Sequence, residues 1–173
     1  MPALDLPESY QAITLDWLTC ALRSTGTLKD ASVATIDAVP LGEQLGFTGI
    51  IVRFELAYDQ PEDGAPASLV GKFPSLDRFA DPTTKEFMVQ VNQREIRFYR
   101  EVAPHVPIRT PHFYYGDSDP ESGRSALLIE DLSDAQPPDP ENGCTPEQIR
   151  LIVANIARFH AALWEKPQLE TLD

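Results

Sequence analysis

One lysine and one glutamate are the residues best suited to chemistry in this sequence. Lys72 lies near the end of the apolar stretch 67–74 (Ala-Ser-Leu-Val-Gly-Lys-Phe-Pro), which is typical of a short buried strand. At about 100° per residue, Glu95 falls within the apolar stripe of a helix over residues 87–102. That stripe consists of Phe87, Val91, Phe98 and Val102. Because a carboxylate facing a core is costly unless a cation meets it, we expect Glu95 to form an ion pair with Lys72.

Two interpretations fit this pair of residues. A carboxylate can hold an ammonium group in place while the ammonium binds two phosphate oxygens of a nucleotide. Alternatively, the pair is a plain salt bridge, or Lys72 extends from the end of its strand into solvent. Taken alone, the two residues leave both interpretations open.

Three glycines upstream could form a phosphate-binding loop. Gly42, Gly46 and Gly49 lie in the stretch 41–49 (Leu-Gly-Glu-Gln-Leu-Gly-Phe-Thr-Gly). Glycines let backbone N–H groups approach a phosphate closely. The spacing matches neither a Walker loop nor a dinucleotide-binding fingerprint, and a glycine-bearing hairpin turn is the common alternative.

The elements that must position these residues follow from periodicity and turn chemistry. Thr14 is expected to cap a first helix, Thr83 or Thr84 to cap the helix that carries Glu95, and Pro104 to end that helix. Thr145 to Gln148 form a capping box that starts a last helix. The helices are expected at 15–24, 87–102 and 145–164, and the strands at 32–39, 49–58, 68–73, 111–116 and 125–131. The order predicts an α+β fold with a five-stranded antiparallel sheet and a helix inserted between its third and fourth strands.

This order of parts resembles the small lobe of a protein-kinase-like small-molecule phosphotransferase. The superfamily includes aminoglycoside phosphotransferases, choline kinases and ecdysteroid kinase-like proteins. The ecdysteroid kinase-like branch is most similar, on the segments Glu95-Ile-Arg-Phe-Tyr99, 104–111 before Phe-Tyr-Tyr, Leu128-Ile-Glu-Asp-Leu132 and Arg158-Phe-His-Ala-Ala-Leu-Trp164. The resemblance implies a nucleotide-binding lobe at 1–132, a hinge or linker at 133–144, and at 145–173 the first helix of an α-helical large lobe that is otherwise absent.

The resemblance also implies a role for individual residues. Lys72 would contact the α- and β-phosphates of ATP, Glu95 would orient it, and residues 42–49 would cover the phosphates. Val70 would lie above the adenine and Ile129 would border its pocket. The carbonyl of Glu130 and the amide of Leu132 would bind the adenine edge. The alternative for Glu130 and its neighbour Asp131 is a solvated pair at a strand end.

The catalytic loop of that superfamily, His-x-Asp with a downstream Asn and a metal-binding Asp, is not found in this sequence. His105 is followed by Val-Pro, His112 by Phe-Tyr and His160 by Ala-Ala. We expect His105 and His112 to be surface residues and His160 to pack in the apolar face of its helix. No catalytic or metal-binding residue is therefore predicted in this chain, and the Mg²⁺ ligands are expected in the large lobe.

The predicted function is that of the ATP-binding lobe of a kinase that transfers the γ-phosphoryl group to a hydroxyl-bearing small molecule. The chain is expected to be part of a longer protein and to be inactive alone. The alternative is a noncatalytic nucleotide-binding or protein-interaction module, from a degenerate or truncated kinase.

Composition narrows the partners and the location. The formal net charge of -13 argues against nonspecific binding to nucleic acid or to anionic membranes, because such binding needs a positively charged surface. The sequence shows no membrane span or signal peptide, and Cys20 and Cys144 are expected to be free thiols, so a cytoplasmic location is predicted. The last helix would expose its apolar face in the isolated fragment, which predicts dimerisation or aggregation.

Overall fold

The computed structural model describes residues 4–41, 49–75, 81–135, 141 and 143–166, which form an α+β fold. The chain divides into two compact units, and each is described by itself. The first comprises Met1–Arg100 and Pro111–Asp131, and the second comprises Glu101–Thr110 and Leu132–Asp173. The first unit contains the sheet and the first two α-helices, so it carries most of the predicted site residues.

The five described strands form one open antiparallel sheet in the order β1-β2-β3-β5-β4. The strands are β1 (Val33–Pro40), β2 (Gly49–Tyr58), β3 (Ser68–Pro74), β4 (Phe113–Ser118) and β5 (Ser125–Glu130). Each predicted strand is present, with its ends within two residues of those expected. The prediction of a five-stranded antiparallel sheet is therefore confirmed.

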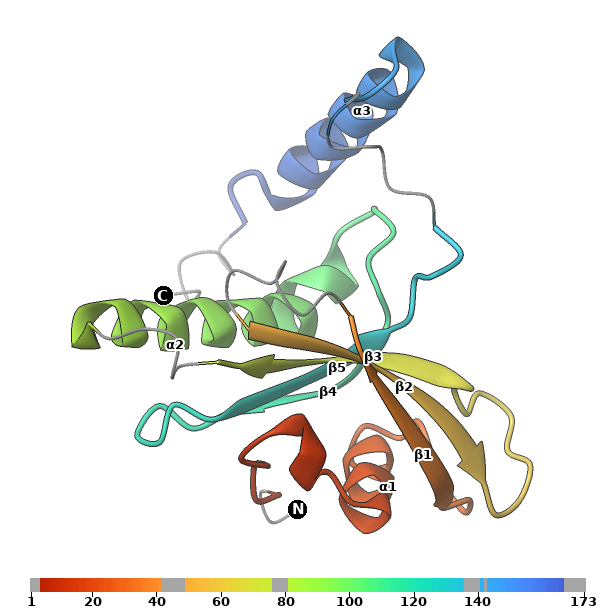
Figure 1. Cartoon of the computed structure of the whole chain (residues 1–173). Coiled ribbons are helices and arrows are strands. Elements are labelled where there is room, and N and C mark those ends of the chain that lie inside the picture. Colours follow the sequence, from red (N-terminus) through yellow and green to blue (C-terminus); the bar gives the residue numbers. More distant parts are fainter. Residues whose placement is uncertain (1–3, 42–48, 76–80, 136–140, 142, 167–173) are drawn as a thin grey trace. The chain divides into compact units, whose positions relative to one another are not determined.

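Helices α1 (Leu15–Ser24) and α2 (Pro82–Arg97) lie on opposite sides of this sheet (Figure 1). Successive side chains of β3 alternate between the two sides, as the pleat requires. Leu69 and Phe73 belong to the larger core with α1, whereas Val70 packs against the smaller core that contains Ile96 of α2. The strands that build the main core thus present a second set of side chains to the α2 side.

Helix α1 is fixed to the sheet by side chains of its first half. The Thr14 side chain accepts a hydrogen bond from the Trp17 N–H at 3.1 Å, so the predicted N-cap is confirmed. Trp17 also packs edge-on against Tyr115 of β4, with ring centroids 5.3 Å apart. The buried Thr19 hydroxyl accepts a hydrogen bond from the Val33 N–H at the start of β1.

Helix α2 differs from its prediction in its cap, in its length and in the face that it buries. Asp81 is the N-cap, and its carboxylate accepts from the Thr84 N–H at 2.8 Å, so the expected Thr83 or Thr84 cap is wrong. The α-helix ends at Arg97 and continues as a π-helical turn, η3 (Phe98–Val102), and a 3-10 turn, η4 (Ala103–His105). Pro104 therefore lies inside the 3-10 turn.

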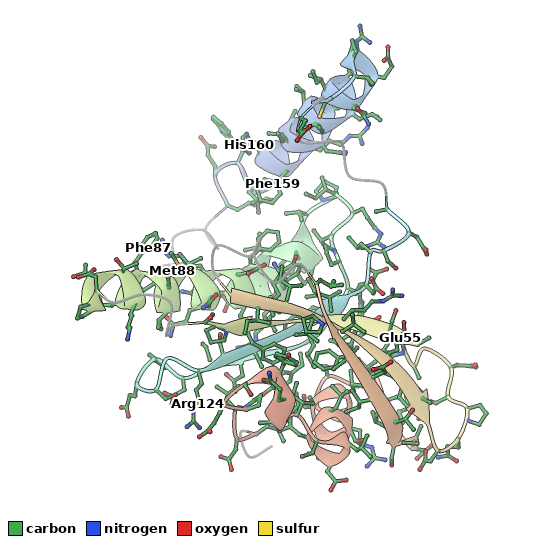
Figure 2. All side chains as sticks on the ribbon, viewed as in Figure 1. Glu55, Phe87, Met88, Arg124, Phe159 and His160 are labelled. Carbon is green, nitrogen blue, oxygen red and sulfur yellow. The ribbon has the colours of Figure 1, made fainter. Side chains whose placement is uncertain are left out.

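The predicted apolar stripe of α2 is rotated away from the face that the helix buries. Phe87 is 54% exposed, whereas its neighbour Met88 is 5% exposed; both are labelled in Figure 2. The inward side follows Met88 and Ile96, eight residues apart, and between them the Nδ2 atom of Asn92 is buried. Apolar residues lie on two adjacent stripes of this helix, so periodicity alone could not choose between them.

In the second unit, α3 (Pro146–Leu163) starts at the predicted capping box. The Gln148 N–H donates to the Thr145 side chain at 3.2 Å, and the Thr145 N–H donates back to the Gln148 side chain at 2.7 Å. No residue of α3 is buried, and its exposed apolar side chains are Ile149, Leu151, Ile152, Val153 and Ile156, followed by Trp164. Within the described part of the chain, no helix is long and apolar enough to cross a membrane.

The histidines lie at the surface. His105 and His112 are exposed, as predicted. His160, labelled in Figure 2 beside Phe159, is exposed as well. The expectation that His160 packs within an apolar face is wrong for this chain, because none of the apolar side chains of α3 is buried.

A single carboxylate holds the segment that leads into β1. Glu62, in the turn between β2 and β3, accepts backbone hydrogen bonds from Lys29, Asp30 and Ala31 at 2.6, 3.0 and 2.7 Å. These bonds, that from Ala31 above all, hold the pKa of Glu62 below its ordinary value of 4.5. The ionised form of Glu62 is therefore the form that the folded state prefers.

Replacing Glu62 by glutamine is expected to remove part of the acid sensitivity of folding. A depressed pKa adds stability that is fully present above about pH 4.5 and is lost as the pH falls through the lower folded-state value. The free energy of unfolding, measured by urea titration from pH 7 to pH 3, should thus fall more steeply for the wild type. If the free energy of unfolding fell equally steeply for both proteins, the lowered pKa of Glu62 in the folded state would be contradicted.

Candidate functional site

The predicted ion pair between Lys72 and Glu95 is present. The Lys72 Nζ donates to the Glu95 Oε1, joining β3 to α2. The two side chains are 34% and 31% exposed, so each is about two-thirds buried while the pair remains open to solvent on one side. The pair is therefore not enclosed in the core.

The local sequence explains why these two side chains meet. Lys72 lies two residues after Val70, and the alternation of β3 places both on the α2 side, opposite Leu69 and Phe73. Glu95 lies in the last turn of α2, next to the buried Ile96. One turn later, burial and the charge of Glu95 raise the pKa of the Tyr99 hydroxyl above its ordinary value of 10.0.

Two apolar residues lie beside the ion pair on the same side of the sheet. Val70 is paired across the β3–β5 ladder with Ile129, and both pack in the smaller core with Ile96. On the next two strands outward, Arg53 is paired with Val70, and Val39 with Arg53. Val39 is 46% exposed, and Arg53 separates it from Val70.

The glycine prediction is only partly within the described structure. Gly42 and Gly46 lie outside the described residues. Gly49 begins β2, where an added Cβ atom would lie 2.3 Å from the Phe73 carbonyl oxygen. The close approach of β2 to β3 accounts for a glycine at this position, with or without a phosphate nearby.

Glu130 and Asp131 are held by neighbours, so the alternative interpretation of a solvated pair at the strand end is wrong. The Glu130 carboxylate accepts from the His112 N–H at 2.9 Å, and the Glu130 N–H donates to the His112 carbonyl at 2.9 Å. The Asp131 side chain is only 6% exposed. Leu132 belongs to the second unit, where its carbonyl accepts from the Ala135 N–H and its side chain is 40% exposed.

Sequence reasoning missed the partners of Asp131. The Ser68 hydroxyl donates to the Asp131 Oδ2 at 2.8 Å, and the Arg53 Nε lies 2.8 Å from the same oxygen. The available signal was the alternation of β2, which places Arg53 on the side opposite the buried Val52 and Phe54. An arginine on the side of the sheet that α2 covers would have indicated an acidic partner near it.

Comparisons of the chain with known protein families, with curated proteins and with solved structures found no match. Within the described residues, no group of three or more His, Cys, Asp and Glu side chains is placed to hold a metal ion. The chemistry of the site therefore has to be inferred from its own residues. These are an accessible ammonium held by a carboxylate, an apolar pair beside it, and a strand end held by side chains on both sides.

Proposed function

We propose that this chain is the ATP-binding lobe of a small-molecule kinase, similar to the kinase-like phosphotransferases that its sequence resembles. The observation that carries the proposal is the ion pair between Lys72 and Glu95 next to Val70 and Ile129. A fixed, accessible ammonium suits the phosphates of a nucleotide, and an apolar surface beside it suits the flat face of a base.

In this proposal each residue has a defined task. Lys72 binds the α- and β-phosphates, and Glu95 keeps its ammonium group in place. Val70 lies above the adenine and Ile129 borders it, while the Glu130 carbonyl and the Leu132 amide bind the adenine edge. Gly42, Gly46 and Gly49 belong to the loop that covers the phosphates, and residues 133–144 form the hinge or linker to a large lobe that begins at 145–173.

The reaction of the whole kinase is transfer of the γ-phosphoryl group of Mg-ATP to a hydroxyl of a small molecule. Phosphoryl transfer depends chiefly on positioning and on charge stabilisation. This lobe supplies the positioning of the nucleotide, while the catalytic base, the Mg²⁺ ligands and the acceptor pocket are assigned to the large lobe. The free cysteines Cys20 and Cys144 fit a cytoplasmic protein, and the exposed apolar side chains of α3 favour self-association of the fragment.

The second candidate is a noncatalytic nucleotide-binding or protein-interaction module. It is favoured by the three histidines, none of which is followed by the x-Asp of a catalytic loop. The two candidates differ in turnover, because only the kinase forms ADP when its complete chain is given an acceptor. A complete chain that binds Mg-ATP and forms no ADP with any hydroxyl acceptor would support the module.

Thermal unfolding in the presence of Mg-ATP tests whether the lobe binds a nucleotide. A ligand that binds only the folded state at one hundred times its Kd stabilises that state by about 2.7 kcal/mol. For a chain of this size the midpoint of unfolding should rise by about 5–10 °C. Magnesium chloride alone is the control and should leave the midpoint unchanged. An unchanged midpoint at millimolar Mg-ATP would overturn the proposal.

A further inference from the structure

The side chain of Arg53 reaches across a neighbouring strand. Arg53 lies on β2 and is paired with Val70 of β3, while Asp131 directly follows β5 on the far side of β3. The Arg53 Nε nevertheless lies 2.8 Å from the Asp131 Oδ2. The Nε–H does not point along this line, so the contact is an ion pair rather than an aligned hydrogen bond. The arginine therefore lies flat over β3 on the α2 side of the sheet, next to Val70.

Ser68 completes a cluster with Arg53 and Asp131, called here the Asp131 cluster. Its hydroxyl donates to the Asp131 Oδ2 at 2.8 Å from β3, the strand that Arg53 crosses. The Asp131 carboxylate is 6% exposed, and a charge so deeply buried needs partners of this kind. The carboxylate is therefore tied to side chains from two different strands.

Glu130, the residue before Asp131, is held from the opposite face of the sheet. The Glu130 carboxylate accepts from the His112 N–H at 2.9 Å, in the segment that leads into β4. Successive side chains of a strand point to opposite faces, so the two carboxylates act on the backbone from opposite directions. The peptide that joins Glu130 to Asp131 is thus fixed by β2 and β3 on one side and by the start of β4 on the other.

We propose that Asp131, through Arg53 and Ser68, positions the Glu130 carbonyl to bind the base of the nucleotide. The inference rests on the proposed function, which assigns that carbonyl to the adenine edge. A hydrogen-bonding group fixed before binding loses less conformational freedom when the ligand arrives, so binding is tighter. Asp131 is a positioning residue, because its buried carboxylate faces its own partners and not the ligand.

A purely structural tie is the weaker explanation for this cluster. The backbone ladders already join β2 to β3 and β3 to β5 along their lengths. Replacing a buried ion pair by apolar residues of similar volume is often neutral or stabilising, so the pair adds little to stability in itself. What the cluster supplies is a fixed backbone at the strand end beside Val70 and Ile129.

The test compares two ligands, Mg-ATP and Mg-tripolyphosphate, which share phosphates and differ in the base. In the 173-residue chain, Asp131→Asn is expected to weaken Mg-ATP binding about tenfold, the value of one misplaced hydrogen bond. Tripolyphosphate binding should stay unchanged. Calorimetric titration gives both dissociation constants. Lys72→Ala, by contrast, should weaken the binding of both ligands.

Glu55 offers a matched control, since it lies on β2 4.0 Å from the same arginine and is 57% exposed (labelled in Figure 2). Glu55→Gln should leave both dissociation constants unchanged. The double variant Arg53→Met with Asp131→Leu keeps the volume and removes both charges, which guards against a simple loss of folding. It too should bind Mg-ATP more weakly and tripolyphosphate normally.

The outcomes separate the inference from the proposed function. If the wild type binds Mg-ATP and the folded double variant binds it equally well, the inference is overturned while the proposed function stands. The inference is overturned in the same way if Asp131→Asn weakens the binding of Mg-ATP and of Mg-tripolyphosphate to the same degree. If the wild type binds no Mg-ATP, the proposed function is overturned and the inference with it.

Discussion

Replacing Lys72 by alanine is expected to weaken the binding of Mg-ATP by about ten- to hundredfold. Hydrogen bonds to a charged group contribute about 1.5–3 kcal/mol, and in the proposed site the ammonium donates to two phosphates. The variant should still fold. An ion pair about a third exposed at each end contributes at most about 1 kcal/mol, and screening by solvent reduces that. Calorimetric titration of the purified chain measures the effect.

Lys29→Ala is the matched control for this experiment. Its side chain is exposed and lies on the segment before β1, so the loss of one positive charge is the same while the site is untouched. Glu95→Gln should weaken binding less than Lys72→Ala, because the lysine remains but is no longer held by a carboxylate. Equal affinities for the wild type and Lys72→Ala would show that the ion pair is only structural.

The largest loss of stability is expected from Phe54→Ala. Phe54 is 1% exposed and packs edge-on against Phe73, with ring centroids 6.2 Å apart. Deleting a buried phenyl ring leaves a cavity and lowers the free energy of unfolding by about 3–5 kcal/mol. The midpoint of thermal unfolding should fall by about 10 °C. Denaturant titration followed by circular dichroism measures the difference.

Phe87→Ala removes the same ring from an exposed position and serves as the comparison. Phe87 is 54% exposed on α2, and surface substitutions of this kind usually change stability by about 0.5 kcal/mol or less. The pair of variants also tests which stripe of α2 faces the core. A loss for Phe87→Ala as large as that for Phe54→Ala would show that Phe87 is buried after all.

The sheet could be predicted because its strands carry their own signals. In β2, β-branched and aromatic residues alternate between glycine at one end and an acidic turn at the other, and the strand has the predicted bounds Gly49–Tyr58. The caps of α1 and α3 were equally local, since Thr14 and Thr145 bind amides three residues ahead. Features that depend on a few consecutive residues are therefore within reach of the sequence.

Features that depend on residues far apart in the sequence were harder to predict. The buried stripe of α2 is decided by how the helix lies on β3, β5 and β4, and the π-helical turn at Phe98–Val102 shifts the phase after it. The ion pair of Lys72 and Glu95 was predicted correctly, although the stripe that suggested it is not the buried one and both side chains are about a third exposed. Asp131 gave no such signal, since an aspartate after a strand is usually solvated, and its partners Arg53 and Ser68 come from two other strands.

The alternation of β3 has a consequence for engineering. Leu69, Gly71 and Phe73 face the main core, and a Cβ atom added at Gly71 would lie 2.7 Å from the rings of Phe54 and Phe73. Ser68, Val70 and Lys72 face the candidate site. A library randomised only at these even-numbered positions would vary the side chains of the candidate site while leaving the main core with α1 unchanged. One short strand thus offers two separate sets of positions. Substitutions in the even-numbered set change the candidate site, and substitutions in the odd-numbered set change the packing of the main core and therefore the stability of the fold.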